Sequence, residues 1–208
     1  MDNKFLIPIK KELINHGFRV GKKVYEDKLK FSNKWDTGQA NALQADVYGF
    51  IAEAVVCDYF SQPLPELTKG KNDCYDLVHK EKRIDVKKVG YSRASGRTKI
   101  TLNKRQFDRK KDLIDQFLFC TFEGAFNKIK VCVKAKNGKD TVYEIYVPVE
   151  GLTKVWLIGY INTEDVIKSS KIYVWKDREG NPTGESYWIK EKKLRPVEEL
   201  LEESEDDS

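Results

Sequence analysis

The chain has 208 residues, of which 40% are hydrophobic and 12% aromatic, so it is long and apolar enough to form a substantial core. Charged residues make up 34%, the formal net charge is +5, and no apolar run approaches the length that spans a bilayer. The N-terminal residues show neither a hydrophobic signal segment nor a small-residue cleavage site, so we expect a cytoplasmic, intracellular protein without membrane contact.

The first clear element along the chain is a helix at residues 39–60. Its apolar residues, such as Val47 and Ile51, recur at helical spacing, and two prolines follow it. The basic segment before it predicts only a short helix within residues 10–20, which ends at Gly17.

The middle of the chain predicts a hairpin, a helix and a buried strand. Residues 74–79 and 83–89 are short runs of β-forming residues on either side of a polar turn. A Gly/Ser/Arg-rich loop leads to a helix at 102–114. Residues 116–122 are almost continuously apolar, which is typical of a strand buried on both faces.

The remaining elements alternate between strands and a little helix. Residues 129–136 and 141–149 flank an Asn-Gly turn and predict a second hairpin. Residues 155–161 predict another central strand, 162–170 a short helix and 171–194 a terminal hairpin. Two tryptophans on opposite arms of this terminal hairpin, Trp175 and Trp188, are expected at the core or its edge, where they can pair across strands.

This order of elements predicts an α/β fold with a mixed central β-sheet flanked by helices and an extra C-terminal β-hairpin. We expect a single domain over residues 1–197, with its core at about 40–165. Residues 198–208 are an acidic tail expected to lack stable structure.

The charge is unevenly divided between body and tail. Residues 198–208 hold seven acids and no base, so residues 1–197 have 38 bases against 26 acids, a net charge of +12. A body this basic favours a polyanionic partner, and nucleic acid is the first candidate. The tail is interpreted first as a solubilising segment and second as a competitor of DNA for the basic face.

The few cysteines and histidines limit the chemistry that the chain can perform. They are Cys57, Cys74, Cys120, Cys132, His16 and His79. The cysteines form no CxxC pair and are expected as free thiols, and both histidines are expected to be exposed and non-catalytic. A histidine-based zinc site or a Ser-His-Asp triad is hard to build from this set, so metal chemistry has to depend on carboxylates.

Four residues stand out as a candidate catalytic group. Asp85 and Lys87 lie two apart on a predicted strand, so their side chains share one face. Asp76 precedes them across a short turn, and Glu53 lies on the preceding helix with Gly49 one turn before it. Three carboxylates suit Mg²⁺ or Mn²⁺, and a nearby lysine can hold a water or offset charge on a phosphate oxygen.

These residues resemble the PD-(D/E)xK nuclease superfamily, whose members include many restriction endonucleases. The resemblance rests on Glu53 in GFIAEAV, Asp76 in CYDLV, and Asp85 and Lys87 in IDVKK, and it covers about residues 40–125. It implies a restriction endonuclease-like core with Asp76 and Asp85 as metal ligands, Lys87 as the residue that positions water, and Glu53 as a further ligand.

Two positions depart from the family pattern. The residue before Asp76 is Tyr75 instead of proline, at a position that varies widely in the superfamily. Some exonuclease members carry Gln-x-x-x-Tyr on the helix after the core motif, whereas here Gln106 is followed by Lys110, so that branch is not indicated.

A basic stretch follows the motif and is the expected nucleic-acid contact. Its candidate phosphate-binding residues are Arg93, Arg97, Lys99, Lys104 and Arg105. The next basic residues, Arg109 to Lys111, are equally compatible with a solvated helix face.

The leading hypothesis is therefore a Mg²⁺-dependent nuclease that hydrolyses phosphodiester bonds, with DNA as the expected substrate in restriction, recombination, repair or phage DNA processing. The first alternative is a catalytically inactive nucleic-acid-binding protein of the same fold, and the second is a structural or assembly protein. Because both strands of a duplex must be cut, a homodimer is compatible with the leading hypothesis.

Overall fold

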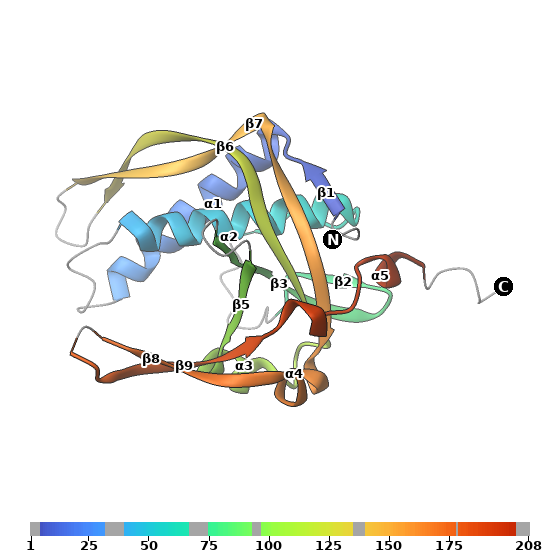
Figure 1. Ribbon diagram of the computed structural model, residues 1–208. Coiled ribbons are helices and arrows are strands. Elements are labelled where there is room, and N and C mark those ends of the chain that lie inside the picture. The colour runs from blue at the N-terminus through green and yellow to red at the C-terminus, as the bar shows by residue number, and fades with distance from the viewer. Residues whose placement is uncertain are drawn as a thin grey trace. The chain divides into compact units, whose positions relative to one another are not determined.

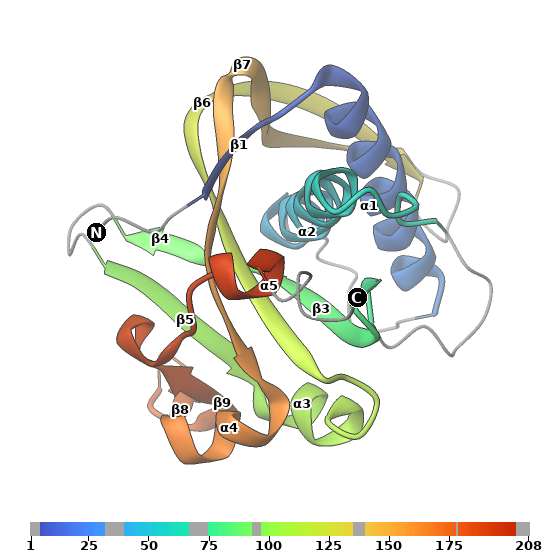
Figure 2. The same cartoon turned by 90° about the vertical axis from the view of Figure 1, so that its right-hand side faces the viewer.

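The computed structural model describes residues 5–31, 40–66, 75–92, 97–134, 140–177 and 179–202. Figures 1 and 2 show its helices and strands in two views. In chain order they are β1 (Phe5–Pro8), α1 (Lys11–Phe31), α2 (Ala40–Tyr59), β2 (Leu77–His79), β3 (Lys82–Lys88), β4 (Gly90–Ser92), β5 (Arg97–Asn103), α3 (Lys104–Lys110), β6 (Gln116–Lys134), β7 (Asp140–Asn162), α4 (Thr163–Ser169), β8 (Ser170–Lys176), β9 (Pro182–Ile189), the 3₁₀ helix η1 (Glu191–Lys193) and α5 (Glu198–Glu202).

The chain divides into two compact units. The first unit comprises residues 1–6, 72–121 and 156–208, and the second comprises residues 7–71 and 122–155. The strands β6 and β7 each contribute residues to both units. Because of these shared strands, the division does not test the predicted single domain.

In the second unit, α1 and α2 lie side by side (Figure 1) and make very close contact through glycine. A Cβ on Gly17 would lie 2.5 Å from Ile51 Cα, and one on Gly21 would lie 2.6 Å from Val47 Cα. The prediction that the first helix ends at Gly17 is therefore wrong. Glycine is used here for the approach of two backbones, so the helix continues to Phe31.

The predicted helix at 39–60 is confirmed as α2. Val47, Ile51 and Val55 are fully buried, but so are Val56 and Cys57, which lie on other sides of the helix. Near its middle, α2 packs on the second-unit part of β6 through aromatic rings, since the Tyr48 centroid lies 5.3 Å from that of Phe122 and 5.8 Å from that of Phe126. The helix is thus buried on several faces instead of along one stripe.

The first unit contains the predicted first hairpin and a parallel strand pair. The strands β2 and β3 are antiparallel, and they are joined by Lys80 and Glu81, which both have positive φ (47° and 61°). The strands β3 and β6 are parallel, with Asp85 opposite Phe117. The five-stranded sheet has the order β1-β7-β6-β3-β2 and is therefore mixed, as predicted.

A second sheet of the order β4-β5-β9-β8 lies in the first unit. Its buried residues Ile100, Leu102 and Tyr187 join a core with Phe107 and Phe117. The Phe107 ring of α3 contacts both Tyr187 (5.1 Å between centroids) and Phe117 (5.8 Å), so this short helix fixes the second sheet against the first. The core positions α3 beside β3.

The terminal hairpin is confirmed as β8 and β9, but the expected tryptophan pair is wrong. Trp175 lies opposite Gly184, and Trp188 lies opposite Lys171. Both tryptophans are exposed, at 37% and 42% of their surface. Trp175 lies on the edge strand β8, and Trp188 alternates with the buried Tyr187 and Ile189 on β9, so its ring is on the opposite face from theirs.

The strands β6 and β7 are longer than predicted. Residues 116–122 and the first part of 129–136 belong to one strand, and 141–149 and 155–161 belong to another. Glycine allows β6 to continue at residue 124, where φ is 127° and a side chain would not fit. A Cβ added to Gly124 would lie 2.0 Å from Leu152 O. The predicted strands are real, but the breaks between them are wrong. The Asn-Gly turn at residues 135–139 lies outside the described residues.

The fold is therefore a mixed α/β structure with a mixed central sheet and flanking helices. The short helix predicted at 162–170 is confirmed as α4, and the acidic tail begins with the helix α5. Within the described residues, no helix is both long and apolar enough to cross a membrane.

Candidate active site

The strand β3 places Asp85 and Lys87 on one face, as the two-residue period of a strand requires. The residues that alternate with them, Ile84 and Val86, are buried at 0% and 4% exposure. Asp85 is itself buried at 1% exposure, which is rare for a carboxylate. The strand therefore carries an ionisable pair that alternates with two buried apolar residues.

Two lysines compensate the buried Asp85 carboxylate. The Lys87 ammonium forms an ion pair with Oδ2, and Lys110 Nζ lies 3.7 Å from Oδ1. Both lysines are partly exposed, at 33% and 38%. A buried charge is tolerated only where it is paired, so Asp85 is held at the boundary between the core and a solvent-accessible space.

Asp76 is attached to the same strand from the other arm of the hairpin. Its backbone N–H donates to Ile84 O (2.9 Å), and its Oδ2 accepts a hydrogen bond from Val86 N–H (2.6 Å). Burial and the nearby Asp85 charge raise the pKa of Asp76 to about 7, although Lys87, Val86 N–H and Lys110 act in the opposite direction. The Asp85 charge is thus close enough to disfavour the ionisation of Asp76.

The helix α3 supplies residues that the sequence hypothesis did not select. Asn103 caps it by accepting a hydrogen bond from Gln106 N–H (3.1 Å), and Gln106 and Lys110 follow at helical spacing on one face. The approach of Lys110 to Asp85 contrasts with the solvated face considered for residues 109–111. The i,i+4 spacing of Gln106 and Lys110 was the available signal, but it becomes informative only when α3 is known to lie beside β3.

These residues line a cavity of about 490 Å³ in the first unit. Its lining includes apolar side chains and also charged and polar groups from four elements, β3, β5, α3 and β9. The lining residues are Asp85, Lys87, Thr101, Leu102, Asn103, Gln106, Phe107, Arg109, Lys110, Phe117 and Ser186. The volume is within the range of small-ligand sites.

The other predicted site residues are in different situations. Glu53 is half-buried on α2 in the second unit, so its membership of the site stays a prediction. Arg93 lies outside the described residues, and for Arg97 and Lys99 only the backbone of β5 is described.

Lys104 and Arg105 lie in the first turn of α3. Lys104 pairs with Asp108 (2.9 Å) and lies 4.0 Å from a Glu185 oxygen, while Arg105 is exposed. Lys104 is therefore partly neutralised by acids, whereas Arg105 faces solvent. The role of each in nucleic-acid binding stays a prediction.

Two carboxylates of the candidate site could bind a divalent cation. Asp76 and Asp85 offer hard oxygen ligands beside a cavity, and burial together with the Asp85 charge raises the pKa of Asp76. Among the described residues, no group of three or more His, Cys, Asp or Glu side chains could hold a metal ion. A complete ligand set therefore needs Glu53, water or substrate oxygens.

Neither histidine and none of the described cysteines lines the cavity of the first unit, and Cys74 lies outside the described residues. His79 is half-buried, and its Nε2 lies 2.9 Å from Leu200 O, so the expectation that it is exposed is wrong. His16 is also half-buried, with Nε2 2.6 Å from Pro65 O. Cys57 and Cys120 are buried free thiols, whereas Cys132 is exposed.

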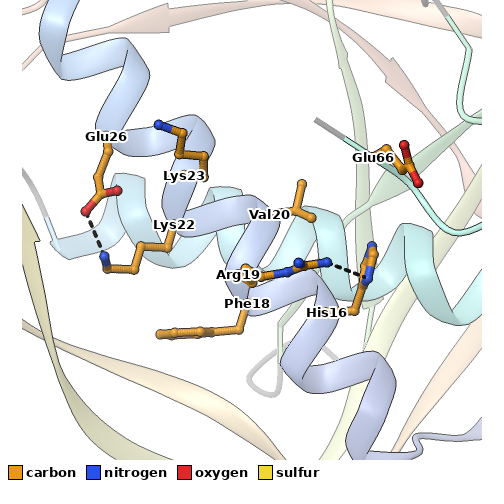
Figure 3. Close-up of a pocket in the computed structure, with 8 residues that line it drawn as sticks. All are labelled: His16, Phe18, Arg19, Val20, Lys22, Lys23, Glu26 and Glu66. Atoms are coloured by element: carbon orange, nitrogen blue, oxygen red, sulfur yellow. Dashed lines mark hydrogen bonds and ion pairs between the residues drawn. The ribbon is translucent and has the colours of Figure 1, made fainter. Parts of the chain in front are cut away.

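The second unit has a cavity of its own along α1 (Figure 3). Its charged side chains pair locally. Lys22 Nζ lies 2.7 Å from Glu26, and Arg19 Nη2 lies 3.4 Å from His16 Nδ1. This internal pairing indicates a stabilised helix surface, and we assign it no chemistry.

The chain matches no protein-family model, no curated protein and no solved structure. The case for a nuclease therefore depends on the residues and their geometry.

Proposed function

We propose that the chain is a metal-dependent nuclease that hydrolyses phosphodiester bonds, with DNA as its expected substrate. The observation that carries this proposal is the buried Asp85, paired with Lys87 on one face of β3 and placed beside Asp76 at a basic cavity. Buried carboxylates beside lysines are costly, and phosphodiester hydrolysis gives them a use. A restriction endonuclease-like core within the mixed α/β fold is part of the proposal.

Each residue has a distinct role in this proposal. Asp76 and Asp85 would hold Mg²⁺ or Mn²⁺, with Glu53 as an additional ligand. The bound ion supplies Lewis acidity and makes a water easier to deprotonate. Lys87 donates a hydrogen bond to the attacking water, and Lys110 neutralises charge on the phosphate oxygens at the cavity.

A catalytically inactive nucleic-acid-binding protein is the second candidate. It is favoured by the two lysines that already neutralise Asp85, and by the lack of three ligating groups together within the described residues. In such a protein, the lysines of the cavity would bind phosphate and the carboxylates would only hold the lysines in place.

A cleavage assay separates these functions. Wild type, Lys87→Ala and Asp85→Asn are incubated with single-stranded and duplex DNA in Mg²⁺, in Mn²⁺ and with EDTA. We expect chelator-sensitive cleavage by wild type and a loss of about 10²-fold or more in each variant, because a transition-state contact is removed. Lys82→Ala is the matched control, since Lys82 is an exposed lysine at the start of β3 and alternates to the opposite face.

Lys110→Ala tests the residue that the structure adds to the group. We expect cleavage to fall by about tenfold or more, since one cation next to the reacting phosphate is removed. Lys111→Ala is the control, because Lys111 is exposed and does not line this cavity. Equal cleavage by wild type and the three test variants, Asp85→Asn, Lys87→Ala and Lys110→Ala, would contradict the proposed mechanism. DNA binding without chelator-sensitive cleavage would favour the second candidate.

A further inference from the structure

The terminal hairpin presents three exposed aromatic side chains. Tyr173 is 43%, Trp175 is 37% and Trp188 is 42% exposed. Isolated exposed apolar residues are ordinary, but adjacent large aromatic rings on one strand pair are not. The hairpin is the orange and red ribbon pair of β8 and β9 in Figure 1.

The strand register places these rings on one face of the sheet. Trp188 lies opposite Lys171, and Tyr173 lies opposite Ser186, two residues further along each strand. Trp175 donates from Nε1 to Ser186 Oγ (2.9 Å), and its ring lies 4.9 Å from that of Tyr173 in an edge-to-face arrangement. We call Tyr173, Trp175, Trp188 and Lys171 the aromatic face.

The aromatic face is continuous with the candidate active site. On the next strand, Thr101 lies opposite Trp188 and Asn103 lies opposite Ser186, so they share its face. Thr101, Asn103 and Ser186 also line the cavity that contains Asp85 and Lys87. Neighbouring strands are about 4.8 Å apart, and alternate residues along one strand are about 7 Å apart. Trp188 is thus one strand spacing from Thr101 of the cavity lining, which is within the length of one nucleotide.

The charge on this face is suited to a polyanion. Lys171 lies in the row of Trp188, whereas Glu185 is opposite Val174 and alternates to the other face of the hairpin. Aromatic rings with an interleaved cation are the usual composition of surfaces that stack bases and hold the phosphates between them.

We propose that the aromatic face binds an unpaired, single-stranded segment of nucleic acid and leads it into the cavity. This inference rests on the proposed function and names its substrate class. Rings can stack on bases only where the bases are unpaired, because the bases of a duplex already stack on one another. The occupant is thus a single strand, or a single-stranded end or gap, in preference to an intact duplex.

The test is a binding measurement without metal. Fluorescence anisotropy in EDTA compares a labelled oligothymidine with a duplex of equal length. We expect tighter binding of the single strand, and affinity about 5- to 100-fold weaker in Trp188→Leu and in Tyr173→Ala, made separately so that a folding defect in one leaves the other informative. Ile172→Ala and Val174→Ala are the controls, since these exposed residues alternate to the opposite face of β8 and should bind like wild type.

The outcomes separate this inference from the proposed function. Ring-dependent single-strand binding by a chain that never cuts would support the inference while the nuclease proposal fails. Chelator-sensitive cleavage would support the nuclease proposal. If Trp188→Leu, Tyr173→Ala and wild type then have equal affinities for the single strand, the inference fails. If sedimentation shows that the ring variants lose a dimer while oligonucleotide affinity is unchanged, the aromatic face is an interface between copies and the inference is overturned.

Discussion

A buried carboxylate has to be paired or protonated, and the two aspartates of the candidate site meet this requirement differently. Asp85 is paired with Lys87 and Lys110. Asp76 accepts a hydrogen bond from Val86 N–H, but burial and the Asp85 charge outweigh it and raise the pKa of Asp76 to about 7. At neutral pH, the charge of Asp76 is therefore unfavourable to the fold.

The pKa of Asp76 predicts that Asp76→Asn stabilises the metal-free protein at high pH. In the unfolded chain, an aspartate ionises near pH 4, whereas the folded pKa is about 7. The contribution of Asp76 to stability is thus full below pH 4, declines between pH 4 and 7, and is lost above. Asparagine does not ionise and can still accept from Val86 N–H.

Urea unfolding in EDTA measures this difference. At pH 8 we expect Asp76→Asn to unfold with a free energy on the order of 1–2 kcal/mol above wild type, with a smaller gap at pH 4.5. Asp112→Asn, at an exposed aspartate after α3, serves as the control and should show no such trend. A variant that is less stable than wild type at pH 8 would show that the Asp76 charge is favourable in the fold.

At the scale of elements, helix packing in the second unit depends on two glycines that appear as helix breakers in the sequence. Gly17 and Gly21 let α1 approach the α2 backbone, where any Cβ would meet Ile51 or Val47 at 2.5–2.6 Å. Backbone atoms cannot move aside as a flexible side chain can. Overpacking at such a contact costs typically about 1–3 kcal/mol or more.

Alanine substitutions test this contact. We expect Gly17→Ala to lower the free energy of unfolding by about 2–3 kcal/mol, because the helices must separate. Gly49→Ala is the matched control, since Gly49 lies in the middle of α2 and its Cβ would meet no atom within 4 Å. There the better helix propensity of alanine should raise stability by about 0.5–1 kcal/mol. Equal effects at both positions would contradict the close contact.

The sequence predicted helices and strands well where neighbouring residues alone determine them. The hairpin of β2 and β3 follows from strand alternation around a polar turn, and the common face of Asp85 and Lys87 follows from the same period. The length of α1 was missed because the use of Gly17 depends on Ile51, which is far away in the sequence. Lys110 was missed for the same reason, since its contact with Asp85 exists only after α3 packs beside β3.

The breaks predicted in β6 and β7 show a further limit of local patterns. Gly and polar residues within 123–128 and 150–154 are typical of loops, yet here they continue two long strands. Glycine is suited to position 124 because β7 approaches the β6 backbone there at Leu152. This cause is again far away in the sequence. The tryptophans of the terminal hairpin were misplaced because hydrophobicity predicts burial, whereas the register places both rings on an exposed face of the hairpin.

For the whole molecule, electrostatics sets a balance between a basic body and an acidic tail. The net charge is +5, but residues 1–197 alone have +12. Four acids, Glu203, Glu205, Asp206 and Asp207, lie in the last six residues. Charges of this kind act on a polyanion through solvent, so their effect is long-ranged at low salt and screened at high salt.

Neutralising the tail therefore predicts a salt-dependent gain in nucleic-acid affinity. Glu203→Gln, Glu205→Gln, Asp206→Asn and Asp207→Asn together raise the net charge from +5 to +9. At 50 mM salt we expect oligonucleotide affinity to rise about two- to fivefold, and at 500 mM salt the gain should vanish because the Debye length is then only about 4 Å. Anisotropy titrations at the two salt concentrations measure this, with Ser204→Ala and Ser208→Ala as a charge-neutral control. A gain well above tenfold would indicate that the tail competes directly for the basic face, whereas equal affinities at 50 mM would show that its charge does not reach the binding surface.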